Sequence, residues 1–204
     1  MNRAFAKLFG IENGFAAIEF SGRSDQAIFR EAVRLHGLDD GQFPVLLERF
    51  QQAYCQLLPQ TLPECQGYVL PGVRELLEGM QTAPDAYLGL ATGNFEQGAR
   101  LKLEHYGLHD FFVGGGFGDD SEERADLVRV AIERVAAAAG DGGPHEVYVI
   151  GDTPLDIAAA QANGARPVAV ATGSFAVQEL RAAGAEMVFP DFSRWQDALN
   201  ALLG

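Results

Sequence analysis

Two aspartates at the end of the apolar stretch 147–150 are the strongest candidates for chemistry. Asp152 follows this stretch, which is typical of a buried strand, and Asp156 lies about one turn into the helix that Pro154 would begin. Mg²⁺ takes one or two carboxylates together with substrate oxygens and water, so the pair could hold this cation. The alternative is structural, with Asp152 capping the helix and Asp156 complementing its dipole. The segment by itself leaves both interpretations open.

A second candidate lies at Thr92, which ends the apolar stretch 87–92 and is followed by Gly93 and Asn94. A hydroxyl beside exposed backbone N–H groups at the start of a helix can bind a phosphate. The alternative is an ordinary helix cap formed by Thr92 or Asn94. We therefore consider this turn a candidate phosphate-binding site, to be weighed together with the other two turns.

Arg124 is the third candidate, at the start of a predicted helix that follows the glycine-rich stretch 114–118. Its guanidinium offers a planar set of donors for a phosphate or for a developing negative charge. A solvated arginine paired with Glu122 or Glu123 is the alternative, because exposed ion pairs of this kind are common.

Other catalytic chemistries have little support in the sequence. No G-x-x-x-x-G-K-[ST] motif occurs, and the glycine-rich stretch does not have the G-x-G-x-x-G context of a dinucleotide site. Cys55 and Cys65 match no metal spacing and read as reduced structural cysteines. The histidines lack the spacing of a zinc site and the surroundings of a serine triad; they are His36, His105, His109 and His145.

The charge balance limits the partners of the chain. In its 204 residues, 28 Asp and Glu oppose 15 Lys and Arg, which gives a formal net charge of −13. Such a field repels nucleic acid and anionic membranes, so we expect neither as a partner. No long apolar run indicates a leader or a membrane span, and we expect a cytoplasmic protein. The oligomeric state, monomer or dimer, is left open.

The elements that must position the candidates fall into two parts. Helical periodicity dominates up to about residue 62, whereas apolar strands alternate with amphipathic helices from Tyr68 onward. We predict an α/β fold, a three-layer doubly wound parallel sheet, with the helical domain over 1–67 and the core over 68–204. In such a sheet, ligands bind beyond the carboxyl ends of the strands, so the three turns should lie close together at that edge. Predicted strands, besides the two stretches above, are 111–113, 167–171 and 187–189.

The ordered set Leu-Ala-Thr92-Gly-Asn, Arg124 and Gly-Asp152-Thr-Pro-Leu-Asp156 resembles motifs two, three and four of the haloacid dehalogenase-like (HAD) hydrolases. The first part resembles the helical cap of the phosphoglycolate-phosphatase-like members, including a loop that here reads Gly22-Arg-Ser-Asp. The resemblance implies a Rossmannoid core and an Mg²⁺-dependent phosphatase that hydrolyses a small phosphomonoester, of the phosphoglycolate or sugar-phosphate type, through an aspartyl-phosphate.

The same resemblance implies a role for each candidate. Thr92 would hydrogen-bond the phosphoryl group, with the backbone of Gly93 and Asn94 assisting. Arg124 would stand where the family more often has lysine and would hold the nucleophile and phosphoryl oxygens together. Asp152 would ligate Mg²⁺ and Asp156 would support the metal site. Arg23 would face the leaving group of the substrate from the cap.

One departure from the family pattern is large. The first motif, D-x-D-G-T, supplies the nucleophile and the acid–base aspartate, and it is absent here. Asp39-Asp40-Gly41 and Asp119-Asp120-Ser121 lie at the wrong places in chain order to replace it. We expect the first core strand to be missing from this chain, with the motif encoded upstream of Met1. The alternatives are a phosphomutase or dehalogenase on the same scaffold, or a non-catalytic relative that binds a phosphorylated ligand or a partner.

Overall fold

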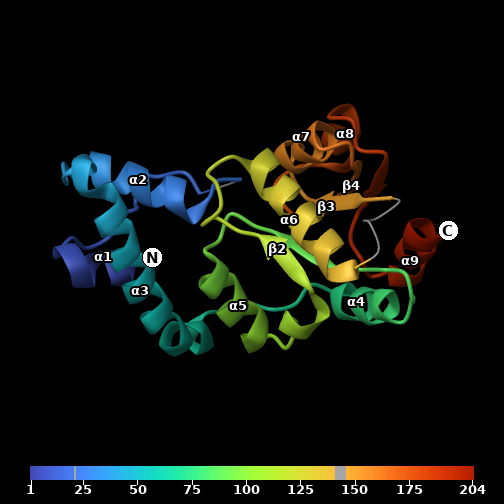
Figure 1. Cartoon of the computed structure of the whole chain (residues 1–204), viewed down its shortest axis with the longest axis horizontal. Coiled ribbons are helices and arrows are strands. Elements are labelled where there is room, and N and C mark those ends of the chain that lie inside the picture. Colours follow the sequence, from blue (N-terminus) through green and yellow to red (C-terminus); the bar gives the residue numbers. More distant parts are fainter. Residues whose placement is uncertain (21, 141–145) are drawn as a thin grey trace.

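A computed structural model describes residues 1–20, 22–140 and 146–204 (Figure 1), so His145 lies outside the described residues. Its α-helices are α1 (Asn2–Phe9), α2 (Asp25–Leu35), α3 (Phe43–Thr61), α4 (Val73–Gln81), α5 (Glu96–His105), α6 (Arg124–Ala139), α7 (Pro154–Ala162), α8 (Val177–Ala182) and α9 (Trp195–Leu203). Its strands are β1 (Gly89–Ala91), β2 (Gly114–Gly116), β3 (Tyr148–Gly151), β4 (Arg166–Val170) and β5 (Met187–Phe189). Short 3₁₀ turns occupy Asp40–Gln42, Leu62–Glu64 and His109–Phe111.

The first part of the chain is helical, as predicted, and is built on aromatic packing. Helices α1, α2 and α3 lie together at one end of the molecule (Figure 1). The rings of Phe29 and Phe50 stack with centroids 4.2 Å apart, and Phe5 packs edge-on against both. Phe95, in the loop before α5, belongs to the same buried cluster. This shared core holds α5, and hence the Thr92 turn before it, against the helical part.

All strand pairings in the described residues are parallel, which confirms the predicted α/β class. β1 pairs with β2, and β3, β4 and β5 form a second sheet in that order. Alternate β4 residues face opposite helix layers: Val168 and Val170 pack with α4 and α9, whereas Ala169 packs with α7 and α8. The second sheet is therefore the middle layer of three.

The expectation that the stretch 147–150 forms a buried strand was wrong, and the stretch 87–92 is partly exposed as well. Ile150 in β3 is 42% exposed, and Tyr87, just before β1, is 46% exposed. Each strand has a partner on one side only in the described part of the chain, since β1 and β3 belong to different sheets. A parallel strand is buried when neighbours and helices cover it on every side, and these two strands lack a neighbour at one edge.

The strand predicted at 111–113 begins later in the chain, and its residues are the three glycines of β2. Residues His109–Phe111 form a 3₁₀ turn, and the ladder begins at Gly114, opposite Gly89. Helix α6 packs so closely on β2 that a Cβ at Gly116 would lie 1.9 Å from the Leu127 carbonyl oxygen. The glycine run, which resembles a loop in sequence, is thus required by helix-to-strand contact.

No helix in the described ranges is long and apolar enough to cross a membrane.

Candidate active site

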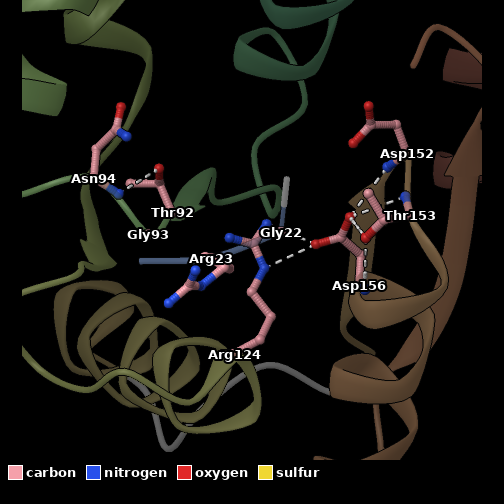
Figure 2. A pocket seen from close by; sticks show the side chains of 9 residues that line it. All are labelled: Gly22, Arg23, Thr92, Gly93, Asn94, Arg124, Asp152, Thr153 and Asp156. Carbon is pink, nitrogen blue, oxygen red and sulfur yellow. Dashed lines mark hydrogen bonds and ion pairs between the residues drawn. The ribbon is translucent and has the colours of Figure 1, made fainter. Parts of the chain in front are cut away.

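The seven predicted site residues converge on one hollow of about 180 Å³. Their side chains or backbone come from four places: the loop before α2, the turn after β1, the start of α6 and the start of α7 (Figure 2). The strands β1 and β3 belong to different sheets, yet both end at this hollow. The residues that line it are Gly22, Arg23, Thr92, Gly93, Asn94, Arg124, Asp152, Thr153 and Asp156.

Asp156 is buried, and its carboxylate is saturated with hydrogen bonds. Its Oδ1 accepts from Arg124 Nε at 2.9 Å and Nη2 at 2.6 Å. Its Oδ2 accepts from the backbone N–H groups of Asp152 and Thr153, at 3.2 and 3.1 Å, and from the Thr153 hydroxyl at 2.8 Å. Thr153 and Asp156 form a capping box, so the cap of α7 is Thr153 and not Asp152. Asp156 therefore orients its neighbours and has no free oxygen for a metal.

Asp152 is the free carboxylate of the hollow: in the described residues its side chain makes no hydrogen bond or ion pair (Figure 2). No group of three or more His, Cys, Asp and Glu side chains in the described ranges could hold a metal ion. Mg²⁺, however, keeps several waters and often takes only one protein carboxylate with substrate phosphate oxygens. Asp152 fits that requirement, and Asp156 fixes the backbone of the turn that carries Asp152.

The turn after β1 has the geometry of an anion seat. Asn94 donates its backbone N–H to Thr92 Oγ1 at 3.2 Å, which leaves the hydroxyl proton of Thr92 free to point outward. Phe95 is the N-cap of α5, so the alternative that Thr92 or Asn94 caps this helix was wrong. A Cβ at Gly93 would lie 2.7 Å from the Arg23 carbonyl oxygen. The absence of a side chain at Gly93 lets the loop before α2 pack directly on the turn.

Asp25 and Lys102 hold this turn in place, and sequence reasoning did not assign them. Asp25, 5% exposed, accepts from the Phe95 N–H at 3.0 Å and from Asn94 Nδ2 at 3.4 Å. Lys102 Nζ donates to Asn94 Oδ1 at 2.7 Å. Burial raises the pKa of Asp25 and lowers that of Lys102. A charged residue at the fourth position of the Gly22-Arg-Ser-Asp loop was the signal for Asp25; nothing marked Lys102.

The two arginines of the hollow differ in their partners. Arg124 begins α6 and pairs with Asp156 at 2.6 Å, rather than with the neighbouring glutamates. Its guanidinium lies between Thr92 and Asp156 in Figure 2, with one nitrogen directed away from the carboxylate. Arg23 donates to Glu31 at 2.5 Å and to the carbonyl oxygens of Glu19 and Ala27. A hydroxyl, a guanidinium and one free carboxylate around one hollow can bind a phosphate together with a divalent cation.

Comparison with known proteins agrees with this geometry. A family model described as HAD-hydrolase-like matches residues 122–195. A phosphoglycolate phosphatase of Rhodospirillum rubrum is 30% identical over 193 residues, which is 93% of this chain and 70% of that protein. A probable phosphatase, IndB, of Dickeya dadantii is 26% identical over 81% of this chain and 70% of that protein.

A solved hydrolase structure from Pseudomonas syringae superposes with a TM-score of 0.60 and 26% identity, over 89% of this chain and 80% of that one. Its similarity extends across both the helical part and the strands, because it covers nearly the whole chain. With parallel α/β strands, the ordered turns at one hollow and a relative 30% identical over most of its length, the chain belongs to the haloacid dehalogenase-like hydrolases.

Proposed function

We propose that the hollow binds the phosphoryl group of a small phosphomonoester, of the phosphoglycolate or sugar-phosphate type, in an Mg²⁺-dependent cytoplasmic phosphatase. The observation that supports this most is the convergence of Thr92, Arg124 and Asp152 from three separate turns onto one hollow. A protein with a net charge of −13 needs local donors to hold an anion, and these turns supply them.

Each residue would have a distinct part in binding. The Thr92 hydroxyl and the Gly93 N–H would donate to phosphoryl oxygens, and Arg124 would add a donor that Asp156 keeps oriented. Asp152 would ligate Mg²⁺, which when bound neutralises phosphoryl charge and polarises the ester bond. Arg23, at the rim, would face the alcohol portion of the substrate.

The covalent step needs a carboxylate in line with phosphorus, and the described lining does not provide a spare one. Asp152 and Asp156 are the carboxylates that line the hollow, and both are already assigned. We propose that a D-x-D-G-T segment outside these 204 residues supplies it. Its first carboxylate would attack phosphorus and displace the alcohol, which takes a proton from the second; water would then hydrolyse the aspartyl-phosphate.

The lack of a spare carboxylate also favours a second candidate, a relative that binds a phosphorylated ligand without turnover. Both candidates predict binding of phosphate through Thr92 and Arg124. They differ in whether chemistry follows once a nucleophile is present.

Two measurements separate these proposals. Isothermal titration with inorganic phosphate and Mg²⁺ should show binding that Arg124→Gln weakens by about tenfold, because a hydrogen bond to a charged group is lost. A phosphate-release assay should show no turnover by the 204-residue chain, and turnover by a chain extended with a strand ending in D-x-D-G-T.

Each possible result of these two measurements favours a different candidate function. Binding without turnover in the extended chain supports the non-catalytic candidate. Turnover by the chain alone, abolished by Asp152→Asn, contradicts the external nucleophile while retaining the phosphatase. Absence of phosphate binding overturns the site itself.

A further inference from the structure

A second hollow of about 270 Å³ adjoins the first, and Arg23 lines both. It lies between the beginning of α6 and the face of α2 that carries Arg30 and Arg34, one helical turn apart. Three of the 15 Lys and Arg residues of this acidic chain gather here. Its lining residues are Arg23, Ala27, Arg30, Glu31, Arg34 and Glu122.

Arg30 is held in a fixed orientation. Its Nε donates to Glu122 Oε1 at 2.9 Å, and its guanidinium lies 3.7 Å from the centroid of the Phe43 ring. The contact with Phe43 and the ion pair together order the guanidinium plane without using its terminal nitrogens. Within the described ranges, the Nη groups of Arg30 donate no hydrogen bond and are available to a ligand.

Arg34 lies one turn later and is less constrained, because its side chain is 63% exposed and it stacks on no ring among the described residues. Its Nε donates to Asp40 Oδ2 at 3.2 Å, and its Nη groups likewise have no acceptor among the described residues. Two guanidinium groups on one helix face, each held through Nε, can present their remaining donors to one anion.

The second hollow is less negative than the chain as a whole. Its lining has three guanidinium groups and two carboxylates, those of Glu31 and Glu122, and Asp40 pairs with Arg34 from outside the lining, so that three negative charges balance the three positive ones. A locally neutral hollow with free Nη donors, on a protein of net charge −13, favours an anion at this place over the rest of the surface.

We infer that the second hollow binds a second anionic group, a carboxylate or a phosphate, on the alcohol portion of the substrate. The inference rests on the proposed function, because it places the phosphoryl group in the first hollow and the anionic tail over Arg30 and Arg34. Arg23, which lines both hollows, lies between the two charges. Phosphomonoesters with neutral alcohols would be selected against, since they leave the second set of donors unpaired.

The test compares ligands that differ only in their tails. Isothermal titration in Mg²⁺ buffer would use inorganic phosphate, ethyl phosphate with its neutral tail, 2-phosphoglycolate with a carboxylate tail, and ethylene glycol bisphosphate with a phosphate tail. The chain should bind at least one of the two anionic-tail ligands about tenfold more tightly than ethyl phosphate. Which of the two binds more tightly identifies the tail as carboxylate or phosphate.

Substitutions test which side chains cause the preference for anionic tails. The double variant Arg30→Gln with Arg34→Gln should lose this preference, so that its affinity for the anionic-tail ligand falls about tenfold more than its affinity for phosphate. Arg129→Gln is the matched control, since Arg129 forms an exposed pair with Glu133 on α6 and lines neither hollow. Glu122→Gln keeps an acceptor for Arg30 but removes a negative charge, and should tighten binding of the anionic-tail ligand several-fold.

Two results would overturn the inference. If the chain binds phosphate but shows no preference for anionic tails, the second hollow is not a subsite, and the proposed function stands. If no ligand binds, phosphate included, both the inference and the proposed function are contradicted. Should the double variant not fold, as judged by circular dichroism, Glu122→Gln decides: weaker or unchanged binding of the anionic-tail ligand contradicts the inference.

Discussion

The saturated carboxylate of Asp156 yields a prediction about stability as well as binding. In Asp156→Asn, the side chain keeps its size but has only one oxygen to accept hydrogen bonds. If the new amide NH₂ faces Arg124, an ion pair that is 6% exposed on the Asp156 side is lost. If it faces the turn instead, the N–H groups of Asp152 and Thr153 lose their acceptor. In either orientation at least two donors are left without a partner.

The magnitude follows from these contacts. Each buried donor left unsatisfied costs about 1–3 kcal/mol, and removing one partner of a buried ion pair costs about 3–5 kcal/mol. The Arg124 side chain is 27% exposed, so water offsets part of the second cost. We expect the free energy of unfolding to fall by about 2–4 kcal/mol, measured by urea denaturation followed by circular dichroism.

Asp126→Asn is the matched control. Asp126 is also an aspartate in the first turn of a helix, but its side chain is 50% exposed and lies 3.7 Å from Arg129. Asp126 also accepts a hydrogen bond from the Ser121 hydroxyl at 3.2 Å, and these exposed contacts together contribute about 1 kcal/mol. If Asp156→Asn were no more destabilising than Asp126→Asn, the carboxylate would not be the organiser that the structure indicates, and the reasoning would be refuted.

Three further predictions concern other parts of the molecule. Gly116→Ala should lower the free energy of unfolding by about 1–3 kcal/mol in urea denaturation, because its Cβ would overlap the Leu127 carbonyl oxygen. In the control Gly114→Ala, the new Cβ would meet its nearest atom at 3.6 Å, so little effect is expected. Equal losses of stability in the two variants would contradict the helix-to-strand contact. Burial raises the pKa of Asp25 above its usual value of 3.8, so its protonated form stabilises the fold at low pH and this contribution is lost as pH rises through the raised pKa. Asp25→Asn should remove that part of the pH dependence of stability above about pH 4, and an unchanged profile would exclude Asp25 as its source. Asp152→Asn should abolish the effect of Mg²⁺ on phosphate titration with little change in melting temperature, since the side chain has no partner in the described residues; retained Mg²⁺ dependence would place the metal elsewhere.

The functional turns are local features, which is why the sequence predicts them. Hydrophobic periodicity marks the strand ends before Thr92 and Asp152, and Pro154 marks the start of α7. The alternation of strands and helices predicts a parallel sheet, and in such a sheet these ends meet at one edge. The candidates at the three turns could therefore be named from spacing and turn chemistry, whereas Arg23 was named only through the resemblance to the family.

Pairing between distant residues could not be predicted in the same way. Arg124 was as compatible with Glu122 as with Asp156, but tertiary packing pairs it with Asp156 and leaves Glu122 to Arg30 on α2. The partners lie 32 and 92 positions apart in sequence, and no local pattern relates them. Ion pairs of this kind depend on which helices pack together.

The strand on the glycines of β2 and the burial of Asp25 have the same origin. A glycine run has no hydrophobic period, so sequence indicates a loop, and only the approach of α6 makes glycine necessary at Gly116. Asp25 resembles an exposed first-turn aspartate until Phe95 and Asn94 pack over it. The sequence by itself determined the elements and the residues capable of chemistry, because these follow from periodicity and residue type. The tertiary structure alone decided which charges are paired, buried or left free, because those properties depend on segments that are distant in the chain.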